Sequence, residues 1–201
     1  MSIFRYCDLL PVSDIDLHIP LQIGWTPTYQ CPAAAETMEV SQVLVKDDGL
    51  NPSASYKDRA SAMAVARAVE LGYEAICTAS TGNAAASLAT CARSIHFPCV
   101  VFVPESTPEA KLVQMLAFGA KVFKVAGNYD QAFDLACAAC DEFGWMNRSA
   151  GFNPYLVEGK KTGAWELAEQ TGFKLPDAVF VSVGDGSIVS GLCKGFQEMK
   201  A

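Results

Sequence analysis

Asn51-Pro52-Ser53-Ala54-Ser55-Tyr56-Lys57-Asp58-Arg59 is the stretch of sequence on which the predicted fold depends. It places Lys57 after an Asn-Pro turn signal and directly before an apolar-periodic run at 60–71, so we expect this lysine at a loop-to-helix junction that faces a cavity. Partial burial at such a junction favours the neutral amine that a nucleophilic lysine needs. Taken alone, the motif also fits a solvated surface lysine, which is the more common case.

The composition is that of a globular protein whose partners are small molecules. The chain has 201 residues, 51% of them apolar and 18% charged, which is enough for a packed core in one or two domains. A formal net charge of -7 argues against a nucleic-acid surface, because phosphate backbones demand clustered Lys and Arg. No window approaches the roughly 18 apolar residues of a membrane span, and the first residues contain no signal-peptide core. We therefore expect a cytoplasmic protein with no nucleic-acid or membrane partner.

The eight cysteines are scattered, without the paired spacing of a zinc module or the density of a secreted scaffold. Cys137 and Cys140 have C-x-x-C spacing, but they fall inside a predicted helix with no histidine nearby. Core packing is therefore favoured over redox or metal chemistry. The sequence predicts no metal site.

Strands and helices alternate along the chain. Predicted strands occupy 40–46, 75–79, 98–103, 121–125 and 178–183, and predicted helices occupy 60–71, 84–93, 107–119, 129–143 and 159–171. This alternation at short spacing predicts an α/β fold, with mainly parallel sheets and helices on both faces. A stretch rich in glycine and asparagine at 144–157 breaks the rhythm and is typical of a crossing between domains.

A second candidate site follows the predicted strand 75–79. Ser80-Thr81-Gly82-Asn83 leads into an alanine-rich helix that begins at Ala84. Small hydroxylated residues at a strand-to-helix turn leave backbone N–H groups of the first helical turn free for a carboxylate or phosphate. An ordinary helix cap is the alternative, and these residues alone favour it.

A third candidate site, Gly184 to Gly191 (GDGSIVSG), lies between the predicted strand 178–183 and a helix. Glycines there let the backbone approach a ligand and turn successive N–H groups towards a phosphate. The loop is neither a Walker loop nor a G-x-G-x-x-G dinucleotide loop. A tight turn without a ligand stays open as the alternative. Because a carboxylate repels a phosphate, the phosphate hypothesis requires the Asp185 side chain to point away.

Together these stretches resemble the threonine synthases, members of the tryptophan-synthase-β-like (fold type II) group of pyridoxal-phosphate enzymes. Residues 51–59 are similar to the NPTGSFKDR segment of that family, which implies pyridoxal 5'-phosphate as cofactor and Lys57 as the catalytic Schiff-base residue. The implied substrate-carboxylate loop consists of Ser80, Thr81, Gly82, Asn83 and Ala84, with Asn83 also contacting the cofactor. The implied phosphate loop consists of Gly184, Asp185, Gly186, Ser187 and Ile188.

The resemblance extends beyond these three stretches. Gly24-Trp25-Thr26-Pro27 resembles the family's G-N-T-P turn, and 104–106 and 153–159 also match family landmarks, so the similarity begins at about residue 20. The sequence departs from the family pattern with Ser53-Ala54 for Thr-Gly and Tyr56 for Phe. Trp25 and Asp185 also stand where the family has other residues.

The resemblance implies a domain organisation as well. Residues 1–58 are expected to begin a large domain, 59–150 to form a smaller βαβ domain, and 151–201 to return to the large domain with the phosphate loop. Because the sequence ends shortly after this loop, we expect it to be the N-terminal portion of such an enzyme, with the large domain incomplete at the C-terminus. The intact enzyme is expected to be a homodimer that takes an amino-acid substrate.

The activity implied is that of a pyridoxal-phosphate-dependent lyase of threonine biosynthesis. It converts O-phospho-L-homoserine and water into L-threonine and phosphate, with Lys57 as general base and acid. Arg59 is expected either to help hold a phosphate or to be structural. A threonine or serine ammonia-lyase, or a cysteate-synthase-like β-replacement enzyme, is the alternative on the same scaffold. A non-catalytic, truncated binding module is the alternative of another class.

Overall fold

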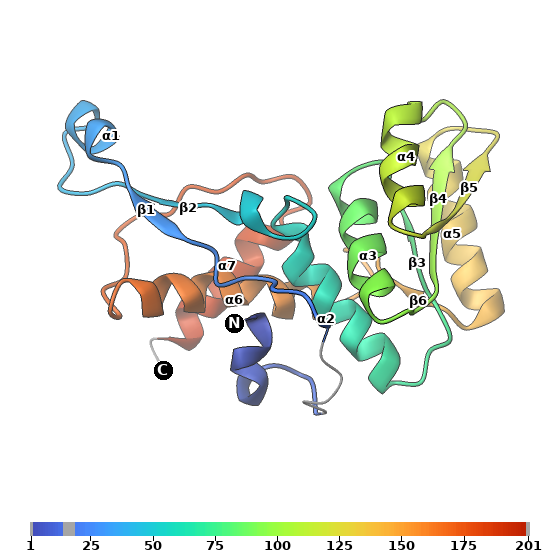
Figure 1. The fold of residues 1–201 in the computed structure, drawn as a ribbon, viewed down its shortest axis with the longest axis horizontal. Helices are drawn as coiled ribbons and strands as arrows, with labels where there is room; N and C mark the ends of the chain where they lie inside the picture. Colours follow the sequence, from blue (N-terminus) through green and yellow to red (C-terminus); the bar gives the residue numbers. More distant parts are fainter. Residues whose placement is uncertain (1, 14–18, 200–201) are drawn as a thin grey trace.

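The computed structural model describes residues 2–13 and 19–199, which form a four-stranded sheet, a separate two-stranded sheet and the helices around them (Figure 1). The strands are β1 (Thr28–Gln30), β2 (Leu44–Lys46), β3 (Ile76–Ala79), β4 (Cys99–Pro104), β5 (Lys121–Val125) and β6 (Met146–Asn147). The α-helices are α1 (Pro32–Thr37), α2 (Lys57–Glu70), α3 (Asn83–Ser94), α4 (Glu109–Ala117), α5 (Tyr129–Phe143), α6 (Tyr155–Gln170) and α7 (Ser187–Glu198), and the 3-10 helices are η1 (Ile3–Leu9) and η2 (Asp48–Leu50). No helix among these residues has the length and apolar character that crossing a bilayer requires.

The four-stranded sheet is parallel throughout and has the order β5-β4-β3-β6. Strands β3, β4 and β5 lie where the sequence predicts strands, and β5 and α5 begin and end at the predicted residues. The α/β fold with a mainly parallel sheet is therefore confirmed. All four strands fall inside 59–150, the range expected for the smaller domain, whereas the domain boundaries themselves stay predictions.

Helices cover both faces of this sheet, as the pattern predicts. In β4, Val101 and Val103 pack into a core cluster that includes buried residues of α2, α3 and α4. Val100 and Phe102, which alternate with them, pack on the opposite face against α5. Figure 1 shows α3 and α4 on one side of the sheet and α5 on the other. The period-two alternation of a fully buried strand thus fills two apolar layers.

Helix α6 lies against the start of α2, and two glycines allow this close approach. A Cβ atom added at Gly159 would collide with the backbone oxygen of Arg59, and one added at Gly163 would collide with the Tyr56 hydroxyl. Gly163 lowers helix propensity when judged from sequence alone. Its tertiary role is to let α2 and α6 approach more closely than any side chain would permit.

Helix α7 packs on α6 in the same way. A Cβ atom at Gly191 would lie 2.7 Å from the Cβ of Lys160, and one at Gly195 would lie 2.8 Å from the Cβ of Ala164. Glycines four residues apart on one helix face therefore bring the start of α7 directly against Lys160. The helices α2, α6 and α7 form one closely packed group (Figure 1).

The N-terminal part differs from the expectation. The predicted strand 40–46 exists only as β2, its last three residues, and β2 pairs antiparallel with the unpredicted strand β1. Pro32 begins the unpredicted helix α1, which fills the connection between the two strands. The pair and α1 extend away from the rest of the molecule at one end (Figure 1).

The predicted strand 178–183 is wrong, because this segment is irregular. Its apolar residues are exposed: Val179 is 43% accessible, Phe180 88% and Val183 66%. A strand forms when a neighbouring strand takes up its N–H and C=O groups, and none of the described residues lies in that position. The described part of the chain provides no partner strand and no apolar surface to bury this run.

Candidate active site

Lys57 is the first residue of α2, at the loop-to-helix junction that the sequence predicts. The Ser55 hydroxyl accepts a hydrogen bond of 3.1 Å from the Lys57 backbone N–H. The lysine side chain is 23% exposed, and its Nζ lies 3.8 Å from Oδ2 of Asp185 in the glycine-rich loop. The first and third candidate sites, which are 128 residues apart in sequence (185 minus 57), therefore meet in space.

The loop before Lys57 is held by the buried carboxylate of Asp58. Its Oδ2 accepts a hydrogen bond of 2.7 Å from the backbone N–H of Ser53, and its Oδ1 accepts another from the Ser53 hydroxyl. Between these anchors, Ala54 has a φ of +55°, which is left-handed backbone. The turn that presents Lys57 is thus fixed by hydrogen bonds between Ser53 and Asp58.

Arg59 is structural. Its guanidinium is fully buried and donates to both carboxylate oxygens of Glu166, at 2.6 and 2.7 Å, and to Oδ1 of Asp48 at 2.8 Å. Burial by itself would lower the pKa of Arg59, but the charge and hydrogen bonds of Glu166 raise it above its usual value. A guanidinium committed to two carboxylates joins α2, α6 and η2 rather than holding a phosphate.

The glycine-rich loop leads into α7 through Gly186, whose φ of +78° favours glycine. Asp185 does not point away, as the phosphate hypothesis required. Its Oδ1 accepts hydrogen bonds from the Ser187 backbone N–H at 3.0 Å and the Ser187 hydroxyl at 2.7 Å, while Oδ2 faces Lys57. Burial would raise the pKa of Asp185, but these hydrogen bonds, with the charges of Lys57 and Lys160, lower it. Asp185 turns towards α7 because an aspartate two residues before a helical N–H can accept a hydrogen bond from it.

The loop at Ser80–Ala84 is not an ordinary side-chain cap. The Ser80 hydroxyl accepts a 3.2 Å hydrogen bond from the Gly82 backbone N–H, and no side chain caps α3, which begins at Asn83. Among the described residues, none accepts a hydrogen bond from the backbone N–H of Asn83 or Ala84. Two free N–H groups at the positive end of a helix dipole are suited to an anion. No hydrogen bond or ion pair in the described part of the chain joins this loop to Lys57 or to residues 184–188.

Two further cations beside the glycine-rich loop, Lys160 and Arg148, were not predicted from the sequence. Lys160 is fully buried, and its Nζ donates to the Ser187 hydroxyl. Burial, assisted by the positive charges of Lys57 and Arg148, lowers the pKa of Lys160 to about 8. Arg148 is also buried, and burial lowers its pKa to about 10. The Nε of Arg148 has no hydrogen-bond partner in the part of the chain that the structure describes.

The residues present fit a phosphate-bearing cofactor next to a lysine. Gly82, Gly184 and Gly186 have open space where a Cβ would be, with no atom within 4 Å. These glycines leave room for a ligand to approach the backbone at both loops. The same loops precede α3 and α7, whose first N–H groups suit anions, and buried cations lie beneath one of them.

A parallel α/β sheet, with a lysine at the start of one helix and a glycine-rich loop at the start of another, is typical of enzymes that hold a phosphate-bearing cofactor beside an amine. The chain belongs to the pyridoxal-phosphate dependent enzyme family, because the family model matches residues 19–201. Its fold is that of the fold type II members, and the family depends on pyridoxal phosphate.

Individual relatives narrow the comparison. The chain is 38% identical over 202 residues to the threonine synthase of Methanocaldococcus jannaschii, covering 100% of this chain and 49% of that protein. It is 37% identical to the threonine synthase of Methanosarcina acetivorans, covering 99% and 49%. The processed form of threonine deaminase isoform 2 from Solanum lycopersicum superposes with a TM-score of 0.78 at 22% identity, covering 86% of this chain and 47% of that one. The chain spans about half the length of the curated relatives it matches.

Proposed function

We propose that the protein is a pyridoxal-phosphate-dependent threonine synthase, a lyase that converts O-phospho-L-homoserine and water into L-threonine and phosphate. The observation that carries the proposal is the position of Lys57, at the start of α2 and 3.8 Å from the glycine-rich loop. The similarity to two threonine synthases at 37 and 38% identity supports this substrate over others of the family.

The proposal gives each predicted site residue a role. Lys57 holds the cofactor through its amine, and the backbone of Gly184, Asp185, Gly186, Ser187 and Ile188 holds the cofactor phosphate. This assignment requires the Asp185 carboxylate to release the Ser187 backbone N–H when the phosphate binds. The free N–H groups at the start of α3 hold the substrate carboxylate, in a loop made of Ser80, Thr81, Gly82, Asn83 and Ala84, and the Asn83 side chain contacts the cofactor ring. Asp185, which caps α7 and faces Lys57, is placed to balance the lysine charge when the amine is protonated.

The chemistry assigned to this chain is mainly proton transfer. When bound, pyridoxal phosphate supplies an electron sink for negative charge at the substrate α-carbon. Lys57, once its amine is free, takes the α-proton and returns protons to the substrate carbons, acting as general base and acid. The same amine removes one β-proton, the bond between the γ-carbon and the phosphate oxygen breaks, and a proton is added at the γ-carbon. Water adds its oxygen at the β-carbon, and the proton that it releases goes to the leaving phosphate.

Three wider expectations belong to the same proposal. The protein works in the cytoplasm, acts as a homodimer when intact, and divides into a large domain at 1–58 and 151–201 with a smaller domain at 59–150. The parallel sheet inside 59–150 supports this division.

Release of inorganic phosphate from O-phospho-L-homoserine tests the activity. We expect the pyridoxal-phosphate-loaded protein to release phosphate with threonine as the product, and Lys57→Ala to lose this by several orders of magnitude because it lacks the base. Ammonia release from threonine or serine without phosphate release would favour an ammonia-lyase instead. Cofactor binding with neither activity would favour the non-catalytic module.

A further inference from the structure

We propose that Lys160 is a phosphate-binding residue, whose ammonium, next to the Ser187 hydroxyl, holds a phosphate dianion at the start of α7. This inference rests on the proposed function, because it concerns the same glycine-rich loop. It adds a side-chain cation to a loop that otherwise offers backbone N–H groups.

Lys160 is placed for this role by the packing of two helices. It lies on α6 with no exposed surface, yet its Nζ reaches the first residue of α7, where it donates to the Ser187 hydroxyl. Gly191 of α7 packs directly against the Cβ atom of Lys160. A fully buried ammonium whose only hydrogen-bond partner among the described residues is a hydroxyl retains unused donors.

The charges around Lys160 leave positive charge in excess. Three cations interact there, namely Lys57, Lys160 and Arg148. The carboxylates that act on them are Asp185 and Asp58, and Asp58 already accepts two hydrogen bonds from Ser53. Three positive charges against two negative ones leave a net charge of +1. Buried charge is costly unless it is paired, so this arrangement favours an additional anion.

The neighbouring geometry favours a phosphate for that anion. No described residue accepts a hydrogen bond from the backbone N–H of Ile188 or Val189 in the first turn of α7. The open space beside Gly184 and Gly186 lies in the same loop. Unbonded N–H donors and a cation at the start of one helix match the oxygens and double charge of a phosphate monoester.

The adjacent lysine shows what a purely structural lysine looks like in this helix. Lys161 is also nearly buried, but its Nζ lies 2.7 Å from Glu158 and 3.2 Å from Glu198, and 4.6 Å from the centre of the Trp165 ring. Lys160 has no carboxylate within 4.0 Å in the described part of the chain. The two residues therefore form a matched pair: one lysine with protein counter-charges and one without.

Thermal unfolding with inorganic phosphate as the probe tests the proposal. We expect phosphate to raise the Tm of the wild-type protein, and Lys160→Gln to weaken phosphate binding about tenfold or more through loss of a charge-assisted hydrogen bond. Lys160→Arg, which keeps the charge, should retain much of the binding. Without phosphate, Lys160→Gln should raise the Tm because it removes an unpaired buried charge, whereas Lys161→Gln should lower the Tm yet keep the phosphate response.

Equal phosphate affinity in wild type and Lys160→Gln would overturn the proposal, as would no phosphate response in the wild type. Repeating the titration on protein loaded with pyridoxal phosphate separates the two sources of phosphate. Loss of the response assigns Lys160 to the cofactor phosphate, and a retained response assigns it to the leaving phosphate of the substrate. The two proposals can fail separately. If borohydride reduction attaches the cofactor to Lys57, but Lys160→Gln binds phosphate as tightly as the wild type, this inference fails and the proposed function stands.

Discussion

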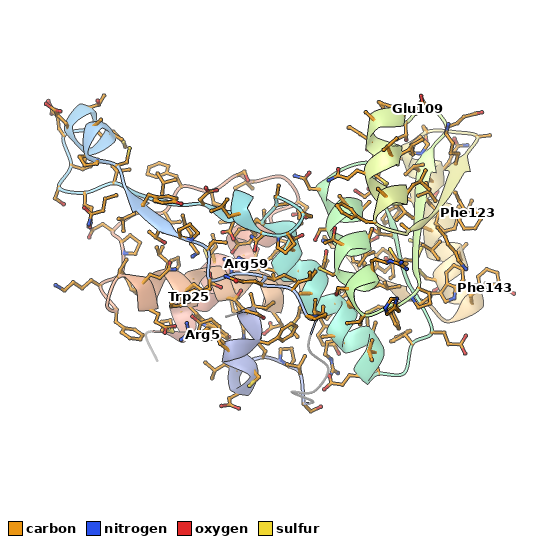
Figure 2. All side chains as sticks on the ribbon, in the orientation of Figure 1. Arg5, Trp25, Arg59, Glu109, Phe123 and Phe143 are labelled. Atoms are coloured by element: carbon orange, nitrogen blue, oxygen red, sulfur yellow. The ribbon has the colours of Figure 1, made fainter. Side chains whose placement is uncertain are left out.

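Ala54 occupies a backbone position that suits glycine, since its φ is +55° in the turn before Lys57. Its side chain is exposed and makes no packing contribution to offset the strain. The family pattern has glycine here, so the departure noted in the sequence coincides with a real conformational cost. Trp25, with a φ of +50°, is a second such departure, but its ring packs 4.0 Å from the Arg5 guanidinium (Figure 2).

We predict that Ala54→Gly raises the free energy of unfolding by about 0.5–1 kcal/mol. Glycine adopts the same left-handed conformation without the Cβ clash, which relieves about 1–2 kcal/mol. This gain exceeds the about 0.4–1 kcal/mol by which glycine favours the unfolded chain. Chemical denaturation measures the change. Ala138→Gly, at an exposed position inside α5, is the control and should lower stability by about 1 kcal/mol. A loss of stability in both variants would show that residue 54 is not strained.

The lowered pKa of Lys160 predicts a stability that rises with pH. Burial, with the charges of Lys57 and Arg148 acting the same way and Asp185 acting against them, moves the pKa from 10.5 to about 8. Between these values the unfolded chain binds the proton that the folded protein has lost, so the free energy of unfolding increases from pH 8 towards pH 10.5. In Lys160→Met this rise should be smaller at every pH in that window. Parallel curves for the two proteins would contradict the assigned shift.

At the scale of elements, the glycine contacts between α2, α6 and α7 are the feature that sequence periodicity does not convey. The helical pattern predicts α6 and treats Gly163 as a weak point, because periodicity reports what one helix prefers by itself. Only the neighbour explains the glycine: the Tyr56 hydroxyl donates a 2.6 Å hydrogen bond to the Lys160 carbonyl and fills the space beside Gly163. The burial of Lys160 could not be predicted for the same reason, since a lysine in a helical pattern usually lies on the solvated face.

We predict that Gly163→Ala lowers the free energy of unfolding by about 1–3 kcal/mol through overpacking, despite the better helix propensity of alanine. In a Tyr56→Phe background the loss should be smaller, because the atom nearest the new methyl group is the hydroxyl oxygen. Equilibrium denaturation of the wild type, the two single variants and the double variant gives the coupling energy between the two positions. Gly151→Ala, where a Cβ meets no atom within 4 Å, is the control for a harmless glycine replacement. Additive losses would show that Tyr56 does not set the helix separation.

Some features of the candidate site could be predicted from the sequence, and others depend on distant residues. The motifs indicated Lys57 and the two loops because small residues at helix starts follow from local chemistry. The orientation of Asp185 could not be predicted, since it depends on whether the carboxylate turns to its own helix and to a lysine 128 positions earlier. The role of Arg59 was open for the same reason: its partner Glu166 is supplied by α6, and the guanidinium is fully buried.

At the scale of the whole molecule, the main feature is an apolar segment at 178–183 that is exposed to solvent. Val179, Phe180 and Val183 are exposed within five residues, which is unusual for the surface of a monomer. The strand prediction failed there because strand formation depends on a partner, and a pattern within one segment cannot supply one. Strands β3, β4 and β5 were predictable because they and their crossover helices lie in one continuous stretch, whereas β6 falls in 144–157, which was expected to be irregular.

We predict that this segment drives self-association. Size-exclusion chromatography of the purified protein should show oligomers that decrease with dilution, and Phe180→Asp should increase the monomer fraction, since charge opposes burial of the segment. Phe143→Asp, at the exposed end of α5 (Figure 2), should leave the distribution unchanged. A compact wild-type monomer at all concentrations would contradict this prediction.

The most direct test of the central claim is the visible absorbance of the protein with pyridoxal phosphate, followed by borohydride reduction and peptide mass mapping. If Lys57 is the cofactor lysine, a visible band should form, vanish in Lys57→Ala, and leave the reduced adduct on the peptide that contains Lys57. An adduct spread over surface lysines, or a band that survives Lys57→Ala, would contradict the account.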